Sequence, residues 1–319
     1  MQEAAQVLIS SLLAAVAALT AGDSLPSKLY THAGHLVTLE PGRRLNLRCL
    51  GNGQPTVMLE SGQWDTSLTW RKVQGQIAGF TRVCSYDRAG LGFSDAARRP
   101  STALNSADDL HRLVRAAGIQ PPFVLVGHSA GGMYAMVYAG LYESDVAGMV
   151  LVDPAFAEQD HETDTKSEVL PMMAERKTCA VLAHQGKLSP NTTHCLRTDP
   201  DPVLNAELNR ESLRPKTQDA WLSEAQNFLV HVAGDYSESA LEAMRIRHDF
   251  QDIPLVVLTP DQAPDARITG QDRLAGYSSA GQSRVVSNSS RYIQLDQPQA
   301  VIDAVHSVVD GARGRISRK

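Results

Sequence analysis

Several patterns that would point to particular protein classes are missing from this 319-residue sequence. It has no block rich in lysine and arginine, and its formal net charge is −5, so nucleic acid is a poor candidate partner. No repeat period recurs, which excludes a solenoid or a collagen-like chain. The HExxH motif, a CxxC pair and a GxGxxG fingerprint between a strand and a helix are also absent. The sequence therefore predicts neither a metal site nor a bound cofactor.

The overall composition is that of a folded globular protein. Hydrophobic residues make up 43% of the chain and charged residues 20%, values that exclude a disordered chain and a protein with many membrane spans. The length suits one large domain of mixed helices and strands that carries an insertion.

The first 22 residues differ from the rest of the chain. Residues 4–21 are almost all small or apolar, and Ala15-Val16-Ala17 offers a cleavage site of the A-x-A kind. The segment before them has no lysine or arginine. We interpret residues 1–22 as a signal peptide or an N-terminal membrane anchor, with an ordinary surface helix as the alternative. A secreted or periplasmic location follows from this interpretation, with membrane anchoring if the segment is kept.

The chain contains four cysteines, namely Cys49, Cys84, Cys179 and Cys195. An even number of cysteines fits two disulfides formed in an oxidising compartment, which agrees with export. The alternative is four buried thiols.

Short strand-like runs alternate with helical patterns along most of the chain. The strand-like runs are 44–49, 56–60, 81–86, 123–127, 149–152, 253–258 and 283–287, and the helical patterns are 70–80, 103–117, 131–141 and 298–309. The run at 123–127 is apolar throughout, as in a strand that is covered on both faces. This alternation predicts an α/β fold with a mostly parallel sheet and helices on both faces.

The strand signal disappears between residues 156 and 249. This stretch is polar and helix-prone, and it holds the second pair of cysteines. We therefore predict a core formed by residues 30–155 and 250–316, and a helical cap formed by residues 156–249.

The strongest chemical signal is the pentapeptide Gly127-His128-Ser129-Ala130-Gly131. It follows a predicted strand and precedes a predicted helix, which is the setting of a nucleophile elbow. The flanking glycines allow the sharp turn that exposes the serine Oγ. The peptide N–H of Ala130, at the helix start, would be one oxyanion-hole donor. The alternative is an inert serine in a glycine-rich turn.

Longer motifs agree with this interpretation. They read PTVMLESG at 55–62, FTRVCSYDRAGLGFSD at 80–95, PPFVLVGHSAGG at 121–132, VAGMVLVDP at 146–154, IPLVVLT at 253–259 and RYIQLDQPQAVIDAV at 291–305. Together with Trp70 they resemble the α/β-hydrolase superfamily, and within it the exported bacterial serine hydrolases. The resemblance implies a twisted sheet of about eight strands with a cap, and a small-molecule ester or acyl compound as substrate.

The resemblance also implies roles for individual residues. Ser129 matches the nucleophile, and Gln63, after Ser61-Gly62, matches the residue that supplies the second oxyanion-hole N–H beside Ala130. Asp153 in VLVDP is the first choice for the acid of the triad, with Asp261 and Asp265 as alternatives. The pocket residues would include His128 and Trp64. Because this fold places its second and fourth strands side by side, Cys49 could bond to Cys84, and a bond between Cys179 and Cys195 would then staple the cap.

The base of the triad is missing. The family carries Ser-Gly-His-Tyr-Ile-Gln-Leu-Asp-Gln-Pro before the last helix, whereas this sequence has Ser289-Ser290-Arg291 before the same seven residues. Arginine stays protonated and has no acceptor, so Arg291 cannot take the serine proton.

Three interpretations of this exchange stay open. The protein is an impaired hydrolase, an enzyme in which another histidine substitutes, or a scaffold for ligand binding or for a reaction other than ester hydrolysis. His161 is the nearest substitute in the sequence, and His231 and His248 are more distant ones. In a binding protein, Arg291 would hold a carboxylate or phosphate.

Overall fold

The computed structural model describes residues 26–157, 166–233 and 236–317. Their main element is an eight-stranded sheet in the order β1-β2-β4-β3-β5-β6-β9-β10. The strands are β1 (His35–Glu40), β2 (Arg43–Leu50), β3 (Val57–Glu60), β4 (Val83–Tyr86), β5 (Phe123–His128), β6 (Val146–Val152), β9 (Leu255–Pro260) and β10 (Gly281–Val286). Strands β1 and β2 pair antiparallel to their neighbours and the others run parallel, which confirms the predicted mostly parallel sheet.

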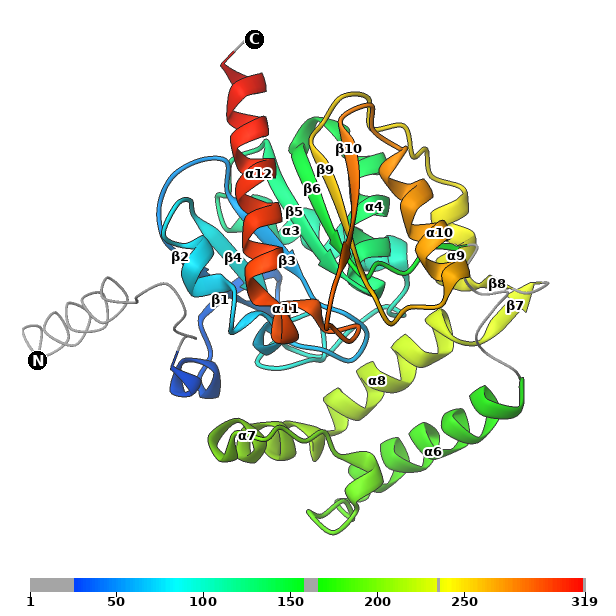
Figure 1. Cartoon of the computed structure of the whole chain (residues 1–319). Coiled ribbons are helices and arrows are strands. Elements are labelled where there is room, and N and C mark those ends of the chain that lie inside the picture. The colour runs from blue at the N-terminus through cyan, green and yellow to red at the C-terminus, as the bar shows by residue number, and fades with distance from the viewer. Residues whose placement is uncertain (1–25, 158–165, 234–235, 318–319) are drawn as a thin grey trace, which may run out of the picture.

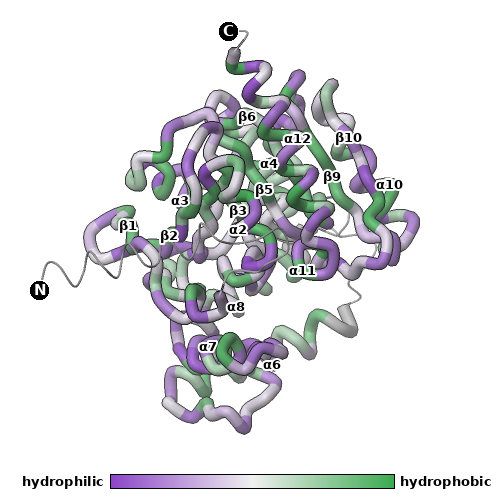
Figure 2. Tube along the Cα trace, turned by 60° about the vertical axis from the view of Figure 1, so that its left-hand side comes forward, coloured by the Kyte–Doolittle hydropathy of each residue, from purple (hydrophilic) through white to green (hydrophobic). Residues whose placement is uncertain are grey.

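Helices cover both faces of this sheet (Figure 1). On one face lie α3 (Ala103–Ala116), α4 (Ala130–Leu141), α9 (Glu238–Met244) and α10 (Asp265–Ala275); on the other lie α2 (Gln74–Ile77) and α12 (Pro298–Ile316). In β5, Leu125 packs toward the first group and Val124 and Val126 toward the second. A strand that buries both of its faces has an unbroken apolar run in its sequence, and Figure 2 colours β5 and β9 as hydrophobic.

Two stretches differ from the sequence prediction. The helical pattern at 70–80 is divided into a short 3-10 helix, η2 (Ser67–Trp70), and the single turn of α2. Strand β1 was not predicted. Only Val37 is buried along it, so no alternation of apolar residues marks this edge strand.

Three helices lie beyond the carboxyl ends of the parallel strands (Figure 1). They are α6 (Lys166–His184), α7 (Pro202–Ser212) and α8 (Pro215–Phe228), followed by the two-stranded ribbon of β7 (His231–Ala233) and β8 (Tyr236–Ser237). The ribbon was not predicted. Helix α9 falls within the predicted cap range but packs on α3 and α4 of the core. The limits of the cap at 156 and 249 stay a prediction.

Both disulfide pairings are present. Cys49 and Cys84 stand opposite each other in the antiparallel register of β2 and β4, and their sulfurs are bonded. Cys179 of α6 is bonded to Cys195 in the short helix η5 (Thr193–Cys195). Among the described helices, none combines the length and hydropathy that a membrane crossing requires. The predicted signal peptide or anchor at 1–22 lies outside the described residues.

Candidate active site

Ser129 forms the turn between β5 and α4. Its backbone has φ 51° and ψ −122°, a conformation that side-chain-bearing residues rarely adopt. The flanking glycines are needed for space: a Cβ on Gly127 would lie 2.4 Å from the Gly131 carbonyl oxygen, and one on Gly131 would lie 2.5 Å from that of Glu60. Strand, strained turn and helix are therefore packed backbone against backbone, as in a nucleophile elbow.

The two predicted oxyanion-hole residues flank this turn. Ala130 is the first residue of α4. Gln63 lies in the loop after β3. Gly131 lies close to the backbone carbonyls of Glu60 and Ser61, which come just before Gln63. The Nε2 atom of Gln63 is buried and makes no hydrogen bond within the described part of the chain. The end of β3 before Gln63 is therefore packed against the start of α4, and the role of Gln63 as an oxyanion-hole donor stays a prediction.

The side chain of Arg291 contacts that of Ser129. It belongs to the segment between β10 and α11 (Ile293–Asp296), and its Nη2 donates a hydrogen bond of 2.8 Å to Ser129 Oγ. The Arg291 carbonyl accepts a second hydrogen bond, of 3.0 Å, from His128 Nε2. The hydroxyl of Ser129 thus faces a permanent cation that has no lone pair to accept its proton.

Asp153 shares this site, whereas Asp261 and Asp265 do not contact it. Asp153 follows β6 at φ 40°, and its buried carboxylate accepts a hydrogen bond of 2.8 Å from Gln271 Nε2 and faces Arg267 Nη1 at 3.4 Å. Burial raises the pKa of Asp153, against the opposing effects of Arg267, Gln271 and Arg291.

The two alternative acids are exposed at the surface. Asp261 accepts a hydrogen bond from the Asn288 N–H in the turn after β10, at 2.9 Å. Asp265 begins helix α10. Of the three candidates, Asp153 alone is placed to act on the charge of Arg291.

Neither His128 nor His248 is placed to act as a substitute base. His128 is buried, and burial lowers its pKa to about 4. Its Nδ1 has no hydrogen-bond partner in the described structure and faces Asp65 Oδ2 at 3.8 Å. His248 stacks on Tyr277 and donates from Nε2 to the Ala243 carbonyl. His161 lies outside the described residues, as does the side chain of His231.

A buried ion network that the sequence did not predict fixes the loop carrying Gln63. Arg88, just after β4, donates to the carbonyls of Ser61 and Gly62 at 2.6 and 2.7 Å and pairs with Glu60 at 2.8 Å. It also pairs at 2.9 Å with Glu224 of α8. The other oxygen of Glu224 accepts a hydrogen bond of 2.6 Å from the Trp64 N–H.

This network couples α8 to the loop of the site. The sequence carries one signal for Arg88, which is the charged pair Asp87-Arg88 directly after the buried strand β4. Nothing in the sequence marks Glu224, which is 136 residues away.

Trp64 lines a cavity beside the site. The cavity has a volume of about 380 Å³ and lies between the loop after β3, η2, α7, α8 and α11. Asp65 and Tyr292 also line it, and Tyr292 packs against the ring of His128 at a centroid distance of 5.0 Å. Neither Ser129 nor His128 is one of its lining residues.

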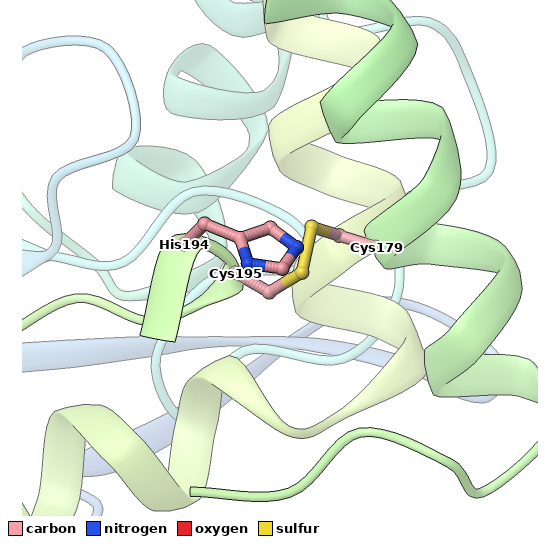
Figure 3. Close-up of side chains that lie close together, drawn as sticks. All are labelled: Cys179, His194 and Cys195. Carbon is pink, nitrogen blue, oxygen red and sulfur yellow. A yellow bond between two sulfur atoms is a disulfide. The ribbon is translucent and has the colours of Figure 1, made fainter. Parts of the chain in front are cut away.

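One group of metal-ligand residues lies apart from Ser129. The ligand atoms of Cys179, His194 and Cys195 are within 4.8 Å of one another. Figure 3 shows the two sulfurs bonded to each other beside the imidazole. Sulfurs that share a disulfide are not thiolates, so this group is not a metal site while the bond is intact.

The fold and the turn at Ser129 together define a class of protein. An eight-stranded, mostly parallel sheet with a strained serine between a central strand and its helix is the architecture of the α/β hydrolases. Residues 57–304 match the model of the alpha/beta hydrolase family, and the chain belongs to that family.

Individual relatives match this chain over a shorter stretch or at low sequence identity. The uncharacterized protein YqjL of Bacillus subtilis (strain 168) is 32% identical over 129 residues, which are 38% of this chain and 51% of that protein. The match thus spans about half the length of this relative. Among solved structures, an esterase from Thermogutta terrifontis has a TM-score of 0.62 at 18% identity, with 88% of this chain and 99% of that one covered. The haloalkane dehalogenase DatA from Agrobacterium tumefaciens C58 has a TM-score of 0.68 at 16% identity, with 87% and 96% covered. Identities this low indicate a shared fold and no more.

Proposed function

We propose that the protein is a serine hydrolase of carboxylic esters or related acyl compounds whose turnover is low because Arg291 stands where the base is required. The observation that carries the proposal is the 2.8 Å hydrogen bond from Arg291 Nη2 to Ser129 Oγ. Ser129 has the strained backbone conformation of a nucleophile, but its neighbour Arg291 cannot remove its proton.

The reaction follows from these groups. Ser129 Oγ attacks the acyl carbonyl carbon, and the N–H groups of Ala130 and Gln63 stabilise the oxyanion that forms. The serine proton has to pass to water or hydroxide, since Arg291 has no acceptor and Asp153 is occupied by Gln271 and Arg267. Loss of general-base catalysis leaves the contribution of the oxyanion hole and of substrate binding.

The first test is p-nitrophenyl butyrate hydrolysis by the wild type, Ser129→Ala and Arg291→His. We expect the wild type to be slow and Arg291→His to be at least about 100-fold faster, because an imidazole at this position can accept the proton and face the carboxylate of Asp153. The rate of Arg291→His should rise with pH through the pKa of the new histidine, since only the neutral ring is a base.

Ser129→Ala in the Arg291→His background is the control and should abolish the gain. Fast turnover by the wild type that disappears in Ser129→Ala would show that another group takes the proton, and His161 would be examined next. No gain in Arg291→His would contradict the assignment of position 291.

A second candidate function is ligand binding without turnover. The guanidinium of Arg291 and the hydroxyl of Ser129 are adjacent donors that can hold a small carboxylate or phosphate. A serine-directed fluorophosphonate separates the two functions: we expect slow labelling of Ser129 in a hydrolase and none in a protein that only binds.

We also propose a secreted or periplasmic location. Two disulfides and the apolar segment at residues 1–22 support it. Fractionation of cells that express the full chain tests this proposal and distinguishes a cleaved signal from a membrane anchor.

A further inference from the structure

Two residues that line the cavity of about 380 Å³ beside the site carry buried polar atoms without a partner in the described structure. Glu211 of α7 and Trp221 of α8 both line it and are 5% and 4% exposed. Neither Glu211 Oε1 nor Trp221 Nε1 makes a hydrogen bond within the described residues. Buried polar atoms without a partner are rare in folded proteins, and a ligand is one reason for them.

The arginines that line the cavity are paired with carboxylates, whereas one carboxyl group there has no ion-pair partner among the described residues. Arg71 is paired with Asp199 at 2.9 Å, and Arg197 with Asp65 at 2.5 Å. Glu211 has no ion-pair partner within the described parts of the chain. The cations that line the cavity are thus neutralised, and its unpaired carboxyl group is that of Glu211.

The groups that face Glu211 come from several elements. Asp87 after β4, Glu207 of the same helix, Arg214 in the α7–α8 connection and Lys216 of α8 act on it electrostatically. The ammonium of Lys216 is occupied by the carbonyls of Gly92 and Ser94. Burial, and next to it Asp87, raises the pKa of Glu211 to about 8.

The walls of the cavity suit an aromatic or apolar body. The indoles of Trp64 and Trp221 line it together with Leu91, which packs in one cluster with both. Aromatic faces attract cations, and the guanidinium of Arg176 already lies 5.9 Å from the ring centroids of both tryptophans. A ligand cation would add to this contact, with the carboxylate of Glu211 as its counter-ion. The volume is large enough for a ligand of about ten to fifteen non-hydrogen atoms.

We propose that this cavity binds a small organic cation, an ammonium group on an aromatic or apolar body, with Glu211 as its counter-ion and the two tryptophans as its walls. Ser129 is not one of the residues that line the cavity, so the proposal does not require turnover at Ser129.

The proposal has a definite pH dependence. The cation binds to the ionised form of Glu211, which is the minor form below pH 8. Affinity should therefore rise about tenfold per pH unit up to pH 8 and level off above it. At pH 7, binding should release close to one proton, which calorimetry in two buffers of different ionisation enthalpy measures.

The experiment uses the full chain and three probes of nearly equal shape: 2-phenylethylammonium, 2-phenylethanol and 3-phenylpropionate. We expect the cation to bind at least tenfold more tightly than the other two. Glu211→Gln should weaken binding of the cation at least tenfold and remove the pH dependence. The control is Asp219→Asn, which alters an exposed carboxylate of α8 that neither lines the cavity nor acts on Glu211 and should change the affinity less than twofold.

Three results would overturn the proposal. One is equal binding of the alcohol and the ammonium, and the second is a preference for the carboxylate, which would make Arg71 or Arg197 the anchor. The third is the absence of binding by all three probes. Ser129→Ala should bind the cation as the wild type does, and a loss there would move the site to the nucleophile. If Glu211→Gln fails to fold by circular dichroism, the proton release of the wild type decides the question alone.

Discussion

At the scale of single residues, the exchange of an imidazole for a guanidinium changes one property of the site and keeps another. Arg291 still reaches Ser129 Oγ, so the contact of a triad is preserved. What is lost is the ability to receive a proton. The sequence register alone predicted which residue stands at this position, because seven residues that match the family follow Arg291. The resemblance placed Arg291 at the base position of the triad, and the fold gives its hydrogen bond to Ser129 across a separation of 162 residues.

His128 gives a prediction that is independent of catalysis. Its pKa is lowered to about 4 by burial, so the folded protein stays neutral at this position while the unfolded chain takes up a proton below pH 6.5. The free energy of unfolding should therefore fall by about 3 kcal/mol as the pH decreases from 6.5 to 4. Denaturant unfolding of the wild type and of His128→Gln at several pH values measures this, and the difference between them should shrink toward acid. A constant difference across that range would contradict a buried neutral His128.

At the scale of secondary-structure elements, the sequence predicted the bounds most accurately for elements that bury both faces or one continuous apolar face. The apolar run of β5 and the amphipathic α3 are of this kind, and their observed bounds lie within one residue of those predicted. Elements at the margins were missed. Strand β1 buries one side chain, and β7 and β8 have three and two residues, so neither a period of two nor a continuous run can mark them.

Helix α8 is connected to the candidate active site through one buried side chain, that of Glu224. Glu224 accepts from the N–H of Trp64, in the loop that carries Gln63, and from Arg88, which binds the carbonyls of that loop. Glu224→Gln should lower the free energy of unfolding by about 3 kcal/mol, because a buried guanidinium loses a charged partner and one hydrogen bond cannot be remade. Chemical denaturation measures the loss.

Asp219→Asn on the same helix is the control for this prediction. Asp219 pairs with His184 at 2.9 Å, but both side chains are more than half exposed. Its removal should cost less than about 0.5 kcal/mol. Equal effects of the two variants would contradict the structural role of Glu224.

At the scale of the whole molecule, two covalent links join segments that the sheet and the outer helices bring together. The Cys179–Cys195 disulfide closes a separation of 16 residues and Cys49–Cys84 one of 35. Restriction of the unfolded chain predicts losses of about 3 and about 4 kcal/mol when each pair is replaced by alanine. Guanidinium unfolding of both double variants measures this, with the reduced wild type as a reference. Four reactive thiols in the unfolded, unreduced wild type would rule out both bonds.

The long-range contacts mark the limit of what the sequence could tell. Family motifs predicted the sheet and the turn at Ser129, since these depend on local patterns of apolar residues and glycine. The pairing of Arg88 with Glu224 depends on how the outer helices lie over the sheet. Their sequence is polar and carries no period that would fix that arrangement.

The bond between Arg88 and Glu224 has a consequence for protein engineering. Grafting a foreign cap onto this sheet would remove Glu224 and leave a buried guanidinium and the peptide N–H of Trp64 without that acceptor. The two parts are therefore not interchangeable modules. A successful chimera would need a carboxylate restored at the matching point of the new helix, or a neutral residue in place of Arg88.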